Sequence, residues 1–451
     1  MADRVERLTP ELREAFLRAQ DAMAEHGLRV LAGAHRPVDE PFDRDALEMG
    51  LTLTGLVGLQ DPPRPEVPDA VGKCHAAGIR VIMVTGDHPH TALAIGREIG
   101  LITSSNPVLV TGDQLRRMTD TRLQLVLDAP EILFARTGAD HKMRIVKALQ
   151  RKKHIVAVTG DGVNDAPALR AADIGIAMGV SGTDVARESA HMILLDDNFA
   201  SIVAAIEEGR AVYDNIRKFL TYILTSNIPE IVPYLAFVLF TIPLPLTILQ
   251  ILAVDLGTDM VPALGLGAEK PNPLAMRRPP RPRAERLLNW PLLRRAYLFL
   301  GPLEAVAAMS AFFFVLEGGG WHYGERLAGT DLLYRQATSA CLGAIIVTQI
   351  SNVFLCRSDR ASAFGSSPIG NKLILVGVGL EIVLIGLITY SPFGNRIFVT
   401  SPLDPRVWLF ILPFAVMMVA LEEGRKWIVR RSRAGMSGSP LDVAAGTRVA
   451  R

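Results

Sequence analysis

The sequence predicts an α/β domain in its first half and an all-α membrane bundle in its second half. Apolar residues make up 49% of the 451 positions, and they gather in the second half. In the first half, short strand-like runs alternate with helical runs, which indicates a parallel sheet covered by helices. In the second half, six apolar stretches reach the roughly 20 residues that a helix needs to cross a bilayer.

Composition narrows the class of protein. A chain of 451 residues is too long for a single core, so two or more domains are expected. The net charge of +2 gives no sign of a nucleic-acid partner. Cys74, Cys341 and Cys356 are widely spaced and match no metal or disulfide pattern, which fits a reducing compartment.

The elements of the soluble half follow in order. A helix is predicted at 9–26, and strands at 28–32 and 51–59. The segment Asp61-Pro62-Pro63-Arg64-Pro65 cannot be helical and marks a domain joint. Helices and strands then alternate as helix 67–77, strand 79–84, helix 91–99, strand 108–110, helix 115–127, strand 132–135, helix 142–150, strand 155–158, helix 166–171 and strand 174–177.

The loop after strand 155–158 carries the strongest chemical signal. Residues 159–169 read TGDGVNDAPAL, so Asp161, Asn164 and Asp165 stand among two glycines. Carboxylates at the end of a buried strand suit Mg²⁺, and the glycines let a phosphoryl group approach the backbone. An ordinary Asp-Gly turn is the alternative for a bare pair, but the whole string favours a metal and phosphate site.

Two further groups are predicted at the same edge of the sheet. Thr85, Gly86 and Asp87 close strand 79–84, and Lys142 opens a helix after another strand. Ligands bind at the carboxyl ends of parallel strands, and a hydroxyl, a cation and a pair of carboxylates can hold a phosphoryl group. Each group alone is more typical of a turn or a solvated helix; their shared order favours one phosphoryl site.

The six predicted spans differ from their connections in charge. Basic residues gather between 270 and 295 and again after the fourth and sixth spans, so the positive-inside rule places both termini and the soluble half in the cytoplasm. The Arg- and Pro-rich stretch 277–286 is predicted to contact lipid head groups. The spans are expected at 219–241, 244–266, 294–316, 336–356, 372–390 and 406–424.

The first two spans contain polar side chains that are costly in a bilayer. TSNIPE places Asn227 and Glu230 on one helix face, and DLGTDMVP adds Asp255, Thr258 and Asp259 on a face of the next span. Each carboxylate costs about 2.5–3.5 kcal/mol on insertion scales. Such oxygens, with carbonyls freed by prolines in the helix, suit a hard cation; a hydrogen-bonded helix contact is the alternative.

Two other carboxylates also fall in apolar spans. Glu304 lies in the third span and Glu381 in the fifth. A buried carboxylate at such a position is a candidate functional group. A second ion or proton site and simple packing against a polar neighbour are both open for these two residues.

The chain resembles the C-terminal half of a type II P-type cation-transporting ATPase, most similar to the Na,K-/H,K-ATPase catalytic subunits, with calcium pumps next. The likeness rests on MVTGDHPHTALAI, TGDGVNDAPAL, TSNIPE and DLGTDMVP and runs from about Leu12 to Arg431. It implies a Rossmann-like phosphorylation domain of the haloacid-dehalogenase type, incomplete in this chain, before six transmembrane helices. The implied domains are a nucleotide-binding tail with a return strand at 1–58, the phosphorylation domain at 59–215, the membrane helices at 216–431 and a disordered tail at 432–451.

The resemblance also implies roles for the candidate residues. Mg²⁺ and ATP are the implied cofactors, with Asp161 as the Mg²⁺ ligand, Asn164 and Asp165 supporting it, and Asp61 and Arg64 at the nucleotide-side joint. The phosphoryl group would contact Thr85, Gly86, Asp87 and Lys142. The transported cation, Na⁺ or K⁺ before Ca²⁺, would be lined by Asn227, Glu230, Asp255, Thr258 and Asp259.

The sequence departs from the family pattern in four places. The strings DKTGT, which holds the family's nucleophilic aspartate, and TGES do not occur, so the chain alone is expected to be inactive without the missing half. Asn352 stands where Na,K-type pumps have an aspartate linked to a third sodium site. Ser226 stands where H,K-type pumps have a lysine, which speaks against that proton chemistry.

Three functions can be compared on this basis. The favoured one is half of an ATP-driven cation pump in the plasma membrane, in contact with lipid and partnered by the missing N-terminal half. The alternative is a non-catalytic membrane scaffold or regulatory fragment that keeps the ion-binding helices. A free-standing phosphatase is disfavoured because no nucleophilic aspartate is present in the family's motif.

Overall fold

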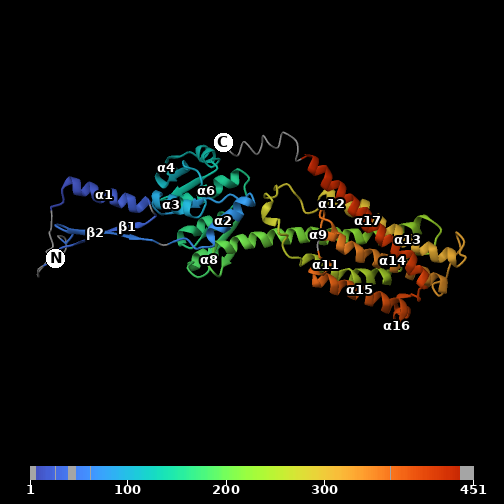
Figure 1. The fold of residues 1–451 in the computed structure, drawn as a ribbon. Helices are drawn as coiled ribbons and strands as arrows, with labels where there is room; N and C mark the ends of the chain where they lie inside the picture. Colours follow the sequence, from blue (N-terminus) through green and yellow to red (C-terminus); the bar gives the residue numbers. More distant parts are fainter. Residues whose placement is uncertain (1–6, 26, 39–46, 61, 366, 437–451) are drawn as a thin grey trace. The chain divides into compact units, whose positions relative to one another are not determined.

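The structure is a computed structural model that describes residues 7–25, 27–38, 47–60, 62–365 and 367–436 (Figure 1). The chain forms two compact units, Met1–Glu207 with Pro273–Pro280 and Glu208–Asn272 with Arg281–Arg451. Of the predicted tail, residues 437–451 lie outside the described residues, and the same holds for Asp61.

The first unit opens with a helix and an antiparallel hairpin. These are α1 (Pro10–Glu25), β1 (Arg29–His35) and β2 (Thr52–Leu59). The register of the hairpin shifts between Gly33 and Ala34. The helix and the two strands predicted for this region are confirmed, although β1 continues past the predicted end at residue 32.

Six further strands form two parallel three-stranded sheets, which confirms the predicted parallel pairing. The order is β3-β5-β4 in one sheet and β6-β7-β8 in the other. The strands are β3 (Met83–Val84), β4 (Val108–Thr111), β5 (Ile132–Ala135), β6 (Ala157–Gly160), β7 (Ile174–Met178) and β8 (Met192–Leu194).

Two differences from the predicted elements have local causes. The strand expected at 79–84 is only two residues long, because the N–H of Ile79 still bonds to Cys74 O at the end of the preceding helix. The helix expected at 115–127 is divided, because Met118 is extended and Thr119 caps a new helix through Arg122 N. Helix α8 (Asp184–Ser189) and strand β8 (Met192–Leu194) have no counterpart among the predicted elements.

The helices of this unit are mostly short and follow the strands. Two of them flank the predicted magnesium loop: α6 precedes β6, and a 3₁₀ turn, η1, leads into α7. Their bounds are α2 (Val67–Ala76), α3 (Pro89–Glu98), α4 (Gly112–Arg117), α5 (Asp120–Val126), α6 (Ala139–Arg151), η1 (Val163–Asp165), α7 (Ala166–Ala171) and α8 (Asp184–Ser189).

Helix α6 packs against two hydrophobic clusters. Its Ile145 belongs to the cluster that contains Phe134 of β5, and its neighbour Val146 belongs to the cluster that contains Val156 and Ala168 beside β6 and α7. All these side chains are at most 8% exposed. Burial on both sides holds the first turn of α6, and therefore Lys142, in a defined place.

The second unit is a helical bundle. Among the described residues, six helices are long and apolar enough to cross a membrane, as predicted, so this is a multi-pass membrane protein. The elements are α9 (Phe199–Leu239), α10 (Ile248–Leu252), η2 (Ala253–Thr258), α11 (Met260–Gly267), η3 (Ala275–Arg277, in the first unit), α12 (Trp290–Arg295), η4 (Ala296–Leu300), α13 (Gly301–Gly318), α14 (Leu332–Cys356), η5 (Ala363–Gly365), η6 (Pro368–Gly370), α15 (Lys372–Tyr390), α16 (Pro392–Phe398) and α17 (Pro405–Met436).

The first and last membrane helices extend beyond their predicted spans. Helix α9 begins at Phe199 rather than near 219, and α17 continues to Met436, so residues 432–436 are helical and do not belong to a disordered tail. Helix α9 is also continuous through Pro229 and Pro233, where an interruption had been expected. Proline removes an N–H without breaking a membrane helix when neighbouring helices support it.

The second and third spans each contain a π-helical segment. Residues Ala253–Thr258 form η2, where the N–H of Asp259 bonds to Val254 O, and Ala296–Leu300 form η4. Such wide turns leave α-type hydrogen bonds unmade and occur frequently at functional sites. The irregularity predicted for the second span is therefore a widened turn, and a second one precedes α13.

Helix α14 lies at the centre of the bundle, beside α13, α15 and α17 (Figure 1). Its span has the largest buried share of the six, at 78%. Phe312 of α13, Ile345 of α14 and Ile385 of α15 share one hydrophobic cluster. Side chains that point inward from α14 are consequently removed from lipid and from water.

A buried cluster of ion pairs joins α12, α14 and α17 at one end of the bundle. Arg295 donates to Glu422 through Nη2 (2.7 Å) and to Asp359 through Nη1 (2.6 Å), while Lys426 donates to Leu355 O. Glu422 and Lys426 are fully buried. Buried charges that are paired and hydrogen-bonded in this way fix the mutual arrangement of α12, α14 and α17.

The soluble unit contains an acid-sensitive contact at Glu131. Its carboxylate accepts hydrogen bonds from the N–H and hydroxyl of Thr103 and of Ser104. Burial raises the pKa of Glu131, but the hydrogen bonds from Ser104 and Thr103 outweigh burial and lower this pKa to about 2. The contribution to stability is therefore complete above the unfolded pKa of about 4.3 and is lost as the pH falls toward the folded pKa.

We expect Glu131→Gln to lower the free energy of unfolding by about 1 kcal/mol near neutral pH, since charge-assisted bonds at a partly exposed site are replaced by weaker ones. The difference in Tm between variant and wild type should shrink as the pH is lowered from about 6 to about 3. Thermal unfolding of the full chain in detergent measures both effects. Glu98→Gln, at an exposed position, is the control; a constant difference across the pH range contradicts the prediction.

Candidate functional site

The Thr85–Asp87 turn follows β3 and closes on itself. Thr85 Oγ1 donates to Asp87 Oδ2 (2.8 Å) and accepts from Asp87 N (3.1 Å). Thr85 is half-buried, and Gly86 and Asp87 are exposed. The turn is therefore fixed by its own hydrogen bonds and is accessible to solvent. Its carboxylate lies at the carboxyl end of a parallel strand.

Thr137 connects this turn to helix α6. Its N–H and its hydroxyl both donate to Thr85 O (3.0 and 2.9 Å). Gly138 follows immediately, and its carbonyl accepts from Lys142 N in the first turn of α6. The ends of β3 and β5 and the start of α6 are thus joined by hydrogen bonds, which positions the backbone of Lys142.

Lys142 and Asp165 form a direct ion pair. Lys142 Nζ lies 2.5 Å from Asp165 Oδ1, and the two side chains are 23% and 6% exposed. The second oxygen, Asp165 Oδ2, accepts from the N–H groups of Asp161 and Gly162 (both 3.2 Å). Asp165 therefore shapes the loop that carries Asp161, and the structure brings Lys142 to this loop.

Gly160 is required by the same contact. A Cβ placed on Gly160 would lie 2.4 Å from Asp165 Cβ, which no relaxed structure permits. The glycine in the TGD string thus allows β6 to approach the buried aspartate closely. This packing requirement explains why residue 160 is a glycine, independently of the metal-binding interpretation of the string.

Asp161 and Asn164 differ from Asp165 because both are exposed. The carbonyl of Asp161 accepts from the N–H (2.8 Å) and the hydroxyl (3.2 Å) of Thr183, which holds its backbone in place. Within the part of the chain that the structure describes, no hydrogen bond or ion pair reaches the carboxylate of Asp161. A held backbone with an unoccupied carboxylate is suited to binding a divalent cation.

Arg64 lies apart from these contacts. Its Nη1 donates to Asp196 O (2.9 Å), and the side chain is otherwise exposed. The structure therefore gives Arg64 a role in bracing the segment before α9. The nucleotide-side role predicted for Arg64 stays a prediction, and that of Asp61 falls on a residue outside the described ranges.

Asp197 is an anchoring residue that the sequence analysis missed. Its backbone has φ +49°, and its carboxylate accepts from the N–H groups of Gly179 (2.7 Å), Val180 (3.0 Å) and Ser181 (2.7 Å). The bond from Val180 is the largest cause that lowers the pKa of Asp197, to about 2. The Asp-Asp-Asn run before an apolar helix was the available signal, since such residues accept bonds from nearby backbone.

In the membrane unit, Asp259 is held by α9. Asp259 is 2% exposed and accepts from Tyr222 Oη (3.1 Å). Ser226 lies beside the same carboxylate and accepts from Gln349 Nε2 of α14 (2.7 Å). Tyr222 and Gln349 were not among the predicted residues, because their contacts join helices that are distant in the sequence.

The other predicted transport residues differ in burial and in hydrogen bonding. Glu230 is 8% exposed with Oε1 lacking a partner, and Asp255 lies beside it. Thr258 is buried and donates to Val254 O in its own helix. Asp255 is exposed, whereas Thr258 and Asp259 are buried, so the three residues predicted to share a face of this span differ in burial.

Asn227 is half-buried on α9, next to Ser226. Over the described residues, no three His, Cys, Asp or Glu side chains gather closely enough to hold a metal ion. The carboxylates of α9 and η2 are therefore neighbours without forming a closed divalent-metal centre.

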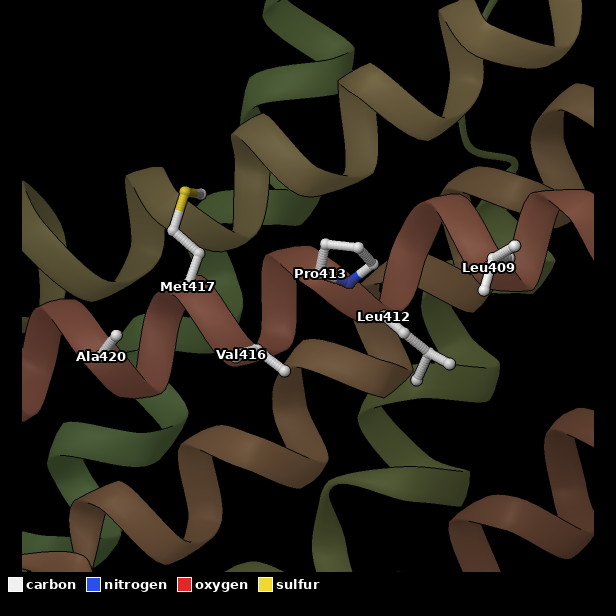
Figure 2. Close-up of a pocket in the computed structure, with 6 residues that line it drawn as sticks. All are labelled: Leu409, Leu412, Pro413, Val416, Met417 and Ala420. Carbon is white, nitrogen blue, oxygen red and sulfur yellow. The ribbon is translucent and has the colours of Figure 1, made fainter.

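A hollow on α17 has a different character. It is a shallow, open hollow with a volume of about 520 Å³, and it is lined only by apolar side chains (Figure 2). Without a charged or hydrogen-bonding side chain it cannot bind a cation, and it suits hydrocarbon chains instead. The lining residues are Leu409, Leu412, Pro413, Val416, Met417 and Ala420.

The two aspartates of the loop should differ sharply in their effect on stability. Asp165→Ala leaves the Lys142 ammonium partly buried and unpaired, so we expect a loss of about 2 kcal/mol in the free energy of unfolding. Asp161→Ala, its matched control, should change this free energy by less than about 0.5 kcal/mol because the side chain is exposed. Thermal unfolding of the purified full chain measures both, and equal losses would show that the assignment is wrong.

Comparison with known proteins finds matches to both units. Residues 4–173 match the haloacid dehalogenase-like hydrolases, and residues 243–428 match the C-terminus of cation transporting ATPases. The chain is 40% identical, over 487 aligned positions, to the sodium/potassium-transporting ATPase subunit alpha-2 of Gallus gallus, covering 95% of this chain and 48% of that protein. It is 38% identical to subunit alpha-1 of Oreochromis mossambicus, covering 96% of this chain and 48% of that protein.

The chain thus spans about half the length of the relatives it matches. The hydrolase match covers both parallel sheets up to the start of β7, with Thr85, Lys142 and Asp161. The ATPase match covers η2 and the four membrane helices after it. Both units therefore match parts of one kind of protein, the cation-transporting ATPases, which confirms the resemblance to the P-type group that the sequence motifs predicted.

Proposed function

We propose that the chain is one half of an ATP-driven pump that moves a hard cation across the plasma membrane. The observation that carries the proposal is that Lys142 pairs with Asp165, while the carboxylate of Asp161, at the carboxyl end of β6, has no partner among the described residues. A cation fixed beside an accessible carboxylate is the arrangement that a phosphoryl group with its Mg²⁺ requires. The membrane half adds buried carboxylates in its first two spans.

A small number of residues would form the phosphoryl site, each with a separate role. Asp161 would hold Mg²⁺, with Asn164 beside it, and bound Mg²⁺ would neutralise charge on phosphoryl oxygens. Lys142 would place its ammonium next to the same oxygens, because Asp165 and the first turn of α6 fix its position. The Thr85 turn would offer its hydroxyl and the N–H groups around Gly86 from the end of β3.

A further strand would complete this site. Among the described strands, β3 pairs only with β5 and β6 pairs only with β7, so each has an edge available for a parallel partner. The string DKTGT does not occur in these 451 residues. We propose that a segment outside them, in the same longer protein or in a separate polypeptide, pairs there and supplies the aspartate that accepts the phosphoryl group.

The cation site would lie between α9 and η2. Glu230, Asp255 and Asp259 would supply charge, with Asn227 and Thr258 as neutral neighbours. The likeness of DLGTDMVP favours Na⁺ or K⁺ over Ca²⁺. The relatives are named as sodium/potassium-transporting, which agrees with this choice.

Helix α9 provides a physical link between the two functions. It begins at Phe199, two residues after the anchored Asp197, and continues without a break past Glu230. Movement at its first turn would therefore be transmitted along a rigid element to the cation ligands. The basic residues near 270–295 favour cytoplasmic placement of the soluble unit and both termini, with residues 277–286 near lipid head groups.

The domain roles inferred from the family belong to the same proposal. Residues 1–58 would be the end of a nucleotide-binding domain, 59–215 the larger part of the phosphorylation domain, and 216–431 the membrane domain. ATP would then be bound mainly by residues outside this chain, with Asp61 and Arg64 near the joint. The alternative, a scaffold that binds cations without turnover, shares the membrane site but needs no phosphoryl chemistry.

We expect the purified chain alone to show no Mg²⁺-dependent ATPase activity, and the chain supplied with the missing half to show cation-stimulated activity. In that complex, Asp161→Asn should lower turnover by about 100-fold or more, because the Mg²⁺ ligand is lost. Asp259→Asn should remove cation stimulation while leaving basal turnover measurable. Asp113→Asn, an exposed change on α4, is the matched control and should behave as wild type.

The outcomes separate the candidate functions. Turnover by the chain alone contradicts the requirement for an external aspartate. Normal cation stimulation in Asp259→Asn rejects the cation site between α9 and η2. A complex that binds cations with no turnover at all supports the scaffold function in place of the pump.

A further inference from the structure

Gln250 is a buried amide of the second span that lies outside the proposed set of cation ligands. It belongs to α10, and its side chain is 0% exposed. Its Oε1 accepts from Thr247 N (3.0 Å), and its Nε2 donates to Phe398 O (3.1 Å) and to Thr338 Oγ1 (3.4 Å). A buried amide has to satisfy both its donors and its acceptor. Gln250 does so by joining α10 to α14 and α16 at one point.

Two of these bonds cross the bundle, whereas the third stays within α10. Phe398 is the last residue of α16, and Thr338 lies on α14. The bond from Thr247 N is part of the capping box of α10, in which Thr247 Oγ1 also accepts from Gln250 N (3.3 Å). The Nε2 group is therefore the part of the side chain that fixes α10 against other helices.

The carbonyl of Phe398 is held in place by its own surroundings. Val399, which follows it, has φ +55°, a left-handed conformation that β-branched residues rarely adopt. Such a conformation persists only where the surrounding contacts determine it. One of these contacts is the bond from Ser401 N to Ser339 Oγ of α14 (2.9 Å). Phe398 O consequently offers Gln250 a fixed acceptor.

Gln250 also lies directly before the segment that contains the proposed cation ligands. Its backbone O accepts from the N–H of Ala253, the first residue of η2. Within η2, the N–H of Asp259 bonds to Val254 O. Because a π-helical turn leaves α-type hydrogen bonds unmade, the positions of Asp255 and Asp259 depend on how the turns beside η2 are held.

The other end of this span is also fixed by side chains of neighbouring helices. Asn215 Nδ2 of α9 donates to Glu269 O (2.6 Å), just after the end of α11. Asn371 Nδ2, at the start of α15, donates to Gly265 O (2.7 Å) within α11. The π-helical segment is thus held between two anchored ends, and Gln250 is the anchor on the α10 side.

We propose that Gln250 is a positioning residue for cation binding. It fixes α10 against α14 and α16 and thereby holds Asp255 and Asp259 in the places from which they bind a cation. The inference rests on the proposed cation site between α9 and η2. Gln250 acts through the backbone of the span and is not itself a ligand. Without its Nε2 bonds, α10 is free to shift along α14, and the carboxylates of η2 shift with it.

The test uses the full chain in lipid nanodiscs and has two readouts. Hydrogen–deuterium exchange of the backbone N–H groups of residues 253–259 is measured in choline chloride, and the affinity for radioactive Rb⁺ is measured by equilibrium binding. Gln250→Leu keeps the approximate size of the side chain and removes both donors. We expect residues 253–259 to exchange at least about 10-fold faster than in wild type, and Rb⁺ to bind at least about 10-fold more weakly.

Two further variants separate positioning from a general loss of stability. Thr247→Ala removes the hydroxyl that caps α10 and leaves both Nε2 bonds of Gln250, so it should lower Tm while exchange at 253–259 and Rb⁺ affinity match wild type. Thr338→Val removes only the partner on α14 and should change both readouts by about 3-fold, in the same direction as Gln250→Leu. Thr338→Val also serves if Gln250→Leu does not fold.

Three results would overturn the proposal. Exchange and Rb⁺ affinity that match wild type in both Gln250→Leu and Thr338→Val reject the positioning role and leave the proposed cation site intact. Equal effects of Thr247→Ala and Gln250→Leu on both readouts also reject it, since capping of α10 would then explain them. A wild-type chain that binds no Rb⁺ rejects the proposed cation site together with this role.

Discussion

A carboxylate buried away from water needs a partner, and most of this structure depends on how that requirement is met. In the soluble unit Asp165 takes Lys142 and two backbone N–H groups, and this contact sets the loop after β6. At one end of the membrane unit Glu422 takes Arg295. In the middle of the bundle, Glu230, Glu304 and Glu381 each keep at least one carboxylate oxygen without a partner among the described residues.

This contrast separates structural charges from functional ones. Paired charges stabilise a fixed arrangement, so their removal is expected to act on folding. Unpaired buried charges lower stability, and a protein that keeps them gains from a ligand that binds only the folded state. Glu230 and Glu304 in the membrane unit belong to this second kind, and Asp161 in the soluble unit is the exposed counterpart. All three lack a partner for at least one carboxylate oxygen within the described residues.

The regular elements followed from local patterns. Strand–helix alternation predicted parallel strands, although in one sheet rather than the two that form, and six apolar stretches predicted six membrane helices. Both patterns follow from apolar periodicity, which is a local property of the chain. The errors arose where a few hydrogen bonds decide the outcome. Thr119 divides a predicted helix, and α9 continues through Pro229 where an interruption had been expected.

The sequence by itself determined which chemistry is predicted: TGDGVND indicates a phosphoryl loop, and the carboxylates of the apolar spans indicate a cation path. Tertiary structure alone decided which atoms are left available. Lys142 reaches Asp165 across 23 positions of chain, and Tyr222 reaches Asp259 across 37. Among the described residues, Asp161 is left without a partner for its carboxylate, and Glu304 of α13 lies beside Asn352 of α14. Such contacts depend on the packing of separate helices, which no local pattern encodes.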